Sequence, residues 1–148
     1  MRGNQDFQGA MFSYINLEKR VPAAHALRKV CAVVDALLAT MHSEFDAVYA
    51  RRGRPSVPPG MPLKALLLQI LFSIRSERQQ VEAIDYNLLY RWFVDLNIKG
   101  KVWDHSTFSA NRERLVDEDL ARAFFERVKL SAQWGGLPAT STSAWTER

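Results

Sequence analysis

Apolar residues recur along most of the chain at the three- and four-residue spacing of amphipathic α-helices. Between residues 27 and 41 they fall on one helical face, at Leu27, Val30, Cys31, Val34, Leu37, Leu38 and Met41. No segment alternates apolar and polar residues over the length of a strand. The pattern therefore predicts an all-α fold, a compact bundle of several helices.

The segment from Leu63 to Ile74 is apolar on both sides, which predicts a central helix surrounded by the others. Pro62 suits the first turn of this helix, where its missing N–H has no cost. The preceding stretch 51–62 contains four prolines and two glycines, which exclude a continuous helix. We therefore expect an exposed connector, either a phosphate-contacting arm or a polar turn, that presents three arginines, namely Arg51, Arg52 and Arg54.

Residues of the capping type indicate where the other helices should begin. The predicted N-caps are Ser43, Ser76, Ser106 and Asp117. A short aromatic helix over 87–96 would lie between the helices that begin at Ser76 and Ser106. These two helices are predicted to form a split helix-turn-helix-like pair. After residue 130 neither helical nor strand periodicity remains, so we expect a helical domain over 1–130 and a disordered, irregular tail over 131–148.

Composition and length fit one globular domain of 148 residues with 47% hydrophobic and 24% charged residues. The single cysteine, Cys31, excludes an internal disulfide and lies within an apolar stripe, where we expect an inert thiol. Residues 1–10 lack a secretory signal, and the apolar stretch 61–72 is shorter than a bilayer span. We expect a cytoplasmic protein with no membrane partner.

Positive charge is concentrated in the middle of the chain. The net charge is +4, and residues 51–114 hold eleven basic and six acidic side chains, an excess of five. Residues 1–50 balance five against five, and residues 115–148 hold four basic and five acidic side chains. The excess indicates a polyanionic partner such as DNA. A solvated basic surface without a partner is the alternative.

The predicted helix 106–115 is typical of a recognition helix. Its hydroxyls and backbone N–H groups could meet phosphates, and its Asn and Arg side chains could bond base edges in the major groove. The candidate residues are Ser106, Thr107, Ser109, Asn111, Arg112 and Arg114, with Arg51, Arg52 and Arg54 for phosphate contact. Arg75, Arg78 and Arg91 follow, although each could instead pair with a neighbouring carboxylate. The alternative is a surface helix whose polar residues face water.

No constellation of residues indicates catalysis or metal binding. The three histidines, His25, His42 and His105, have no carboxylate or cysteine at ligand spacing. The acidic run 117–119 is better explained as the first turn of a helix, where the helix dipole stabilises negative charge. There is no nucleophile motif or glycine-rich phosphate loop. We therefore expect no catalytic residue, no metal site and no cofactor in this chain.

Four long segments between Met11 and Arg127 are distinctive, namely MFSYINLEKRVPAAHALR, ARRGRPSVPP, LLLQILFSIRSERQQVEAIDYNLLYRWFVDL and VWDHSTFSANRERL. In these segments the chain resembles the N-terminal domain of bacterial insertion-sequence transposases of the DDE class. The resemblance implies a helical region that binds the terminal inverted repeats of a transposon. In complete members a ribonuclease-H-like domain follows and holds Mg²⁺ with two Asp and one Glu, so Mg²⁺ is expected only in that domain.

The sequence departs from the family pattern in several places. Members commonly carry an acidic residue at Ala24, a Pro at Ala26 and a Lys at Ala110, where alanine removes a possible phosphate contact. They continue into a strand similar to SDEHFSVDGT, whereas this chain ends in PATSTSAWTER. Trp145 is encoded only by TGG and the codons of Thr146 begin with AC, so the shifted triplet is GAC, an Asp codon. We expect that a frameshift placed this tail out of frame, which the nucleotide sequence tests.

Together these features predict the DNA-binding N-terminal part of a transposase, without strand-transfer activity of its own. Its expected partner is the double-stranded DNA of the transposon ends, and its expected location is the bacterial cytoplasm, in association with the nucleoid. Two alternatives stay open. The chain could be a helical interaction module that oligomerises with itself or inhibits full-length transposase, or it could be a nonfunctional remnant.

Overall fold

The described part of the chain is built from α-helices. The computed structural model describes residues 14–49, 57–117 and 119–132, and its regular elements there are all helical. The helices are α1 (Leu17–Arg20), α2 (Ala26–Thr40), α3 (His42–Val48), α4 (Gly60–Leu71), α5 (Glu77–Tyr86), α6 (Leu88–Phe93), α7 (His105–Asp117) and α8 (Leu120–Ser131). The prediction of an all-α fold is confirmed.

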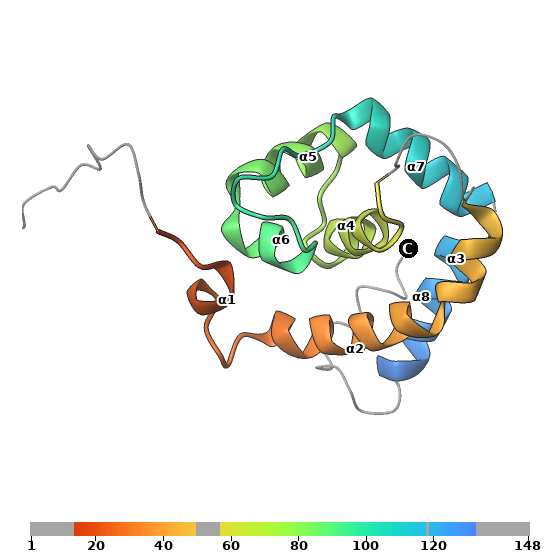
Figure 1. The fold of residues 1–148 in the computed structure, drawn as a ribbon, viewed down its shortest axis with the longest axis horizontal. Helices are drawn as coiled ribbons and strands as arrows, with labels where there is room; N and C mark the ends of the chain where they lie inside the picture. Colours follow the sequence, from red (N-terminus) through yellow and green to blue (C-terminus); the bar gives the residue numbers. More distant parts are fainter. Residues whose placement is uncertain (1–13, 50–56, 118, 133–148) are drawn as a thin grey trace, which may run out of the picture.

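Helix α4 lies at the centre of the molecule. Figure 1 shows it nearly end-on, with α2, α3, α8, α7, α5 and α6 around it. Leu63, Leu67 and Leu68 are completely buried, and Pro62 lies in the first turn as predicted. The predicted central helix is confirmed, since a helix that is apolar on every side is stable only where each side meets another element.

Helix α8 closes the core on one side by packing against both α2 and α7. Its inward face carries Ala121, Phe124 and Val128, which recur at three- and four-residue spacing and are all buried. They join the same apolar core as α4.

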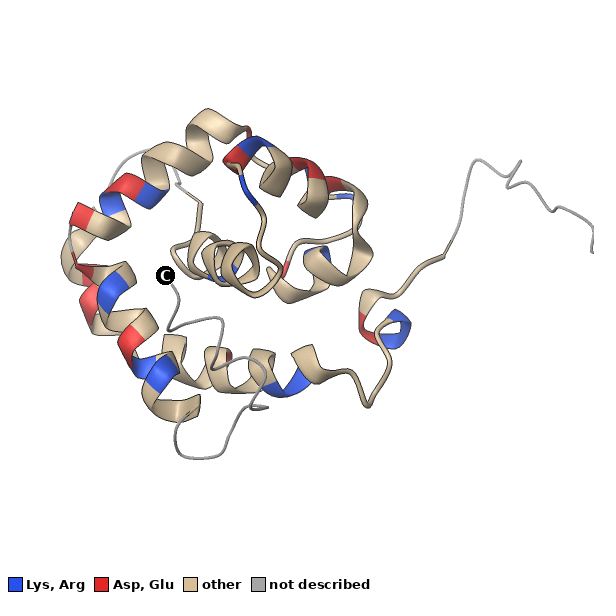
Figure 2. Cartoon of the chain, turned by 180° about the vertical axis from the view of Figure 1, so that it is seen from behind, with Lys and Arg blue, Asp and Glu red and all other residues tan. Residues whose placement is uncertain are grey.

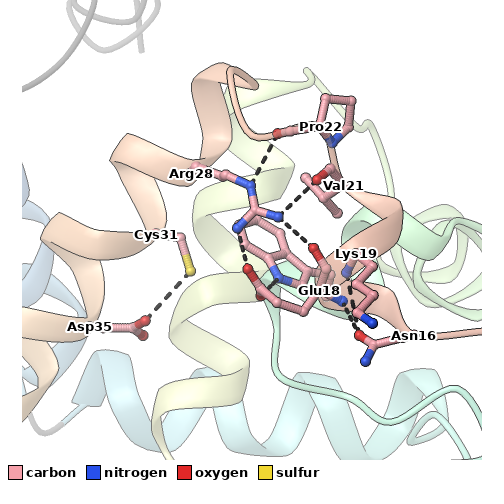
Figure 3. Close-up of polar contacts among 9 residues, drawn as sticks. Asn16, Glu18, Lys19, Val21, Pro22, Arg28, Cys31 and Asp35 are labelled. Atoms are coloured by element: carbon pink, nitrogen blue, oxygen red, sulfur yellow. Dashed lines mark hydrogen bonds and ion pairs between the residues drawn. The ribbon is translucent and has the colours of Figure 1, made fainter.

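Arg28 joins the short helix α1 to α2. Its guanidinium donates hydrogen bonds to the carbonyls of Pro22 and Val21, at 3.0 and 2.8 Å, and forms an ion pair with Glu18 (Figure 3). The Trp92 indole donates to the same carboxylate at 2.6 Å, and Arg28 lies 5.1 Å from the centroid of that ring. Hydrogen bonds from Arg28 and Trp92 lower the pKa of Glu18. This cluster holds α1 on α6.

Of the N-caps predicted from the sequence, Ser76 is confirmed and Ser43 is not. Ser76 caps α5 as predicted, because its Oγ accepts a hydrogen bond from the backbone N–H of Gln79 at 3.2 Å. Ser43 was the wrong choice for α3, which begins at His42 after Met41 and has no side-chain cap. A side chain can cap only where the backbone has already left the helical conformation, and side-chain type alone does not determine that position.

The acidic run near the end of the chain also differs from the prediction. Asp117 is the last residue of α7, and α8 begins after Asp119, which has a left-handed backbone (φ 56°) and no side-chain cap hydrogen bond. The prediction that Asp117 caps the last helix is therefore wrong. Asp104 takes the capping position predicted for Ser106.

Cys31 is buried, as predicted, and desolvation raises the pKa of its thiol to about 11.

None of the described helices is long and apolar enough to cross a membrane. In the same part of the chain, no group of three or more His, Cys, Asp or Glu side chains could hold a metal ion. Of the predicted tail 131–148, Ser131 is the last residue of α8 and Ala132 is buried, whereas residues 133–148 lie outside the described residues.

Candidate nucleic-acid interface

Glu77, the first residue of α5, joins that helix to the predicted recognition helix α7. Its carboxylate accepts a hydrogen bond from the Ser109 hydroxyl, and its Oε1 lies 2.5 Å from Nη1 of Arg112. The contact with Arg112 is an ion pair without hydrogen-bond alignment, because Oε1 has no hydrogen-bond donor among the described residues. Two predicted DNA-contacting side chains are thus engaged by one carboxylate of the chain itself.

The N-terminus of α7 is capped by a carboxylate. Asp104 accepts hydrogen bonds from the Ser106 hydroxyl and from the backbone N–H of Thr107, both at 2.7 Å. The Ser106 and Thr107 hydrogen bonds lower the pKa of Asp104 to about 2. An ionised carboxylate therefore occupies the place at which a helix N-terminus would otherwise bind a phosphate.

Asn111 faces the interior of the molecule. It is 9% exposed, and its amide donates a hydrogen bond to the carbonyl of Thr107 at 2.8 Å, within the same helix. Phe108 and Leu115, on the same side of α7, are almost completely buried. An amide in this position has no open path to a base edge, so we leave Asn111 out of the interface that we propose below.

The outer face of α7 presents Ser106, Ala110 and Arg114 at four-residue intervals, and all three are exposed. Side chains at this spacing lie in one row along a helix. The Arg114 guanidinium lies 5.5 Å from the centroid of the Tyr49 ring, which places it over the end of α3. Glu113 is also exposed on α7, so the row is not uniformly basic.

Arg78 lies in the first turn of α5, the helix that packs beside α7, and Arg75 directly precedes its N-cap residue, Ser76. Both are exposed, and neither forms an ion pair within the described residues. They are therefore free to meet an external anion. No sequence feature had distinguished these two arginines from Arg91.

Arg91, in contrast, is a structural residue. It is buried and ion-paired with Asp85 at 2.8 Å, as its alternative interpretation predicted. Its other donors bond the carbonyls of Asn97 and Gly100, at 2.9 and 2.8 Å. The arginine thereby fixes the turn that leads towards α7.

The predicted arginine connector, with Arg51, Arg52 and Arg54, lies outside the described residues. The two described residues that flank it both lie beside α7. Tyr49 contacts Arg114, and Val57 lines a surface pocket together with Asp104 and Thr107.

Within the described segment 57–114, the basic side chains of the excess in residues 51–114 do not form one basic face (Figure 2). Figure 2 shows Lys and Arg on several helices, with Asp and Glu interspersed. One reason is that Lys64 and Arg91 belong to this excess but are buried with carboxylate partners. Basic residues that lie close together in the sequence are therefore only partly clustered on the surface.

Sequence reasoning missed the role of Glu77 and the burial of Lys64. Glu77 precedes Ser109 by 32 residues, and no local pattern connects the two. Lys64 offered a weak signal, since it lies in a helix that is apolar on all sides and must therefore be enclosed wherever that helix is central.

One comparison with known proteins gives a match. The family model described as a transposase domain (DUF772) matches residues 15–114, which extend from the start of the described chain through most of α7. No curated protein and no solved structure matches the chain.

Proposed function

The chain belongs to the transposase domain family (DUF772), and from this premise we propose that it binds double-stranded DNA at the terminal inverted repeats of a transposon. The observation that carries the proposal is the exposed row on α7 beside the unpaired arginines Arg75 and Arg78. An α-helix fits the major groove of B-DNA, and cations on a neighbouring helix can then reach the phosphates.

In the proposed complex the outer face of α7 lies against the duplex. Arg114 meets the DNA from this face, and Arg75, just before α5, and Arg78, in its first turn, contact the DNA backbone. We assign further phosphate contacts to the connector residues Arg51, Arg52 and Arg54, whose described flanking residues, Tyr49 and Val57, both lie beside α7. Such phosphate contacts position a protein on DNA without reading its sequence. The proposed role of these residues is binding, not catalysis.

Salt dependence of DNA binding tests the proposal. Each phosphate contact contributes about −0.9 to the slope of log K against log salt concentration. Replacing Arg75 and Arg78 together with alanine should therefore make the slope shallower by about 1.8 on a random-sequence duplex, measured by fluorescence anisotropy. The uniform loss across sequences is expected because these contacts are to the backbone.

The matched control is the double replacement of Lys29 and Lys129 with alanine. Both lysines are exposed, on α2 and α8, and the variant has the same net charge as the Arg75/Arg78 variant. The control should leave the slope unchanged. A response to salt that is flat in the wild-type protein, or equal losses in both double variants, would contradict DNA binding through this face.

Replacing Ala110 with lysine should strengthen DNA binding. Ala110 is exposed in the middle of the row on α7, so a lysine there adds one cation without displacing a packed side chain. We expect a slope steeper by about 0.9 and binding about fivefold tighter at 0.15 M salt. The control is Ala36→Lys, an exposed position on α2, which lies across α4 from α7 in Figure 1. Equal gains from both lysines would show that net charge alone is responsible.

A role as a protein-interaction module is the second candidate function. The observation that favours it is the exposure of two aromatic side chains, Tyr86 and Phe72. The ring centroid of Phe72 lies 5.0 Å from that of Tyr90. Exposed aromatic side chains are common at protein interfaces. A flat salt response together with a concentration-dependent mass in sedimentation experiments would support this function in place of DNA binding.

A further inference from the structure

We propose that Glu77 holds Arg112 away from DNA and thereby sets the number of phosphate contacts made by α7. This inference rests on the proposed DNA binding and concerns the same interface. It assigns Glu77 as a positioning residue, since it acts through α7 and does not touch DNA.

The carboxylate of Glu77 is more enclosed than the guanidinium it holds. The Glu77 side chain is 19% exposed, whereas that of Arg112 is 41% exposed. Glu77 also accepts the hydrogen bond from Ser109, so two groups from successive turns of α7 converge on it. The contacts of Ser109 and Arg112 with Glu77 therefore hold α7 against α5.

The difference in exposure decides which partner Arg112 keeps. If Arg112 moved to a phosphate, a largely enclosed carboxylate would lose its cation, and such a loss is costly. The gain would be one contact between an exposed guanidinium and the DNA backbone, which salt screens. Arg112 therefore stays on Glu77 in the complex.

A neutral side chain at position 77 should release Arg112 to the DNA. Glu77→Gln retains an oxygen that can accept from Ser109 but removes the charge that holds the guanidinium. Because Arg112 is at the surface, the freed side chain can reach a phosphate. We expect the salt slope to steepen by about 0.9 and binding to a random duplex to tighten about fivefold at 0.15 M salt.

Glu82→Gln is the matched control. Glu82 is exposed on the same helix and forms no ion pair within the described residues, so the variant has the same change in net charge without affecting Arg112. Its salt slope should equal that of the wild-type protein. If the two glutamine variants have equal slopes, the proposal is wrong.

Arg112→Ala completes the cycle in both backgrounds. In the wild-type background it should leave the slope unchanged, and combined with Glu77→Gln it should restore the wild-type slope. A slope that is shallower by about 0.9 in Arg112→Ala alone would overturn the proposal, because Arg112 would then already contact DNA. This single variant can overturn the proposal even if Glu77→Gln does not fold, as judged by circular dichroism.

The two proposals fail in different ways. If the wild-type protein does not bind DNA, or binds without a contribution from Arg75 and Arg78, the proposed function fails and this inference with it. If those two arginines contribute as expected but Arg112→Ala alone weakens binding, only the role of Glu77 is wrong.

Discussion

Replacing Lys64 with alanine is expected to lower the free energy of unfolding by about 3–5 kcal/mol. The lysine is 1% exposed in the central helix α4, and its Nζ lies 2.6 Å from a carboxylate oxygen of both Asp35 and Asp95. Its ammonium also lies 5.9 Å from the ring centroid of Phe93. Alanine leaves a cavity where the lysine stem packs and removes the charged link between α2, α4 and the turn after α6. Urea unfolding followed by circular dichroism measures the loss.

Lys64→Met separates packing from charge. Methionine keeps an unbranched stem of similar volume, and the two carboxylates, which are about half exposed, can return to water. We expect a loss of about 1–2 kcal/mol, smaller than that of the alanine variant. Equal losses in the two variants would show that the ion pairs, and not the packing of the stem, hold this site together.

The contribution of Lys64 should persist to high pH. Burial by itself lowers the pKa of Lys64, but hydrogen bonds to Asp35 and Asp95 outweigh this effect and raise the pKa. A raised lysine pKa contributes stability that is fully present below the unfolded-state value of about 10.4 and is lost as pH rises through the folded-state value. The stability difference between wild type and Lys64→Met should therefore be constant near neutral pH and decline only above about pH 10.

Replacing Arg91 with alanine is expected to have a comparable effect, about 3–4 kcal/mol. Its guanidinium bonds the carboxylate and carbonyl of Asp85 and the carbonyls of Asn97 and Gly100. Truncation leaves these partly buried acceptors without donors. Because the turn leads to α7, hydrogen exchange should also accelerate at residues 97–102.

Two further variants, Arg91→Lys and Arg122→Ala, test whether the stability lost in Arg91→Ala depends on the planar shape of the guanidinium. A lysine ammonium keeps the charge but cannot bond carbonyls and a carboxylate in the planar geometry of arginine, so a loss of about 2–3 kcal/mol is expected. Arg122 is 76% exposed and pairs with Glu126 one turn away, so Arg122→Ala should change stability by less than about 0.5 kcal/mol. A lysine variant as stable as wild type would contradict the assigned role.

The candidate interface could be predicted only in part. Periodicity and capping residues place α5 and α7 correctly to within a few residues, and the charge excess identifies the segment that contains them. Residue type does not show that Asn111 faces the core or that Ser109 and Arg112 are engaged by Glu77. A helical period identifies the apolar face of a helix, but polar side chains at its border can be directed either way.

By itself the sequence determined the all-helical fold, the central position of α4 and the resemblance to transposases, which the family match bears out. Only the tertiary structure decided which cations are available to a partner. Lys64 meets Asp95 across 31 residues, and Arg127 meets Glu44 across 83. Helical periodicity is a local property of consecutive residues, whereas an ion pair between distant residues forms only after the core has packed and brought the two charges together.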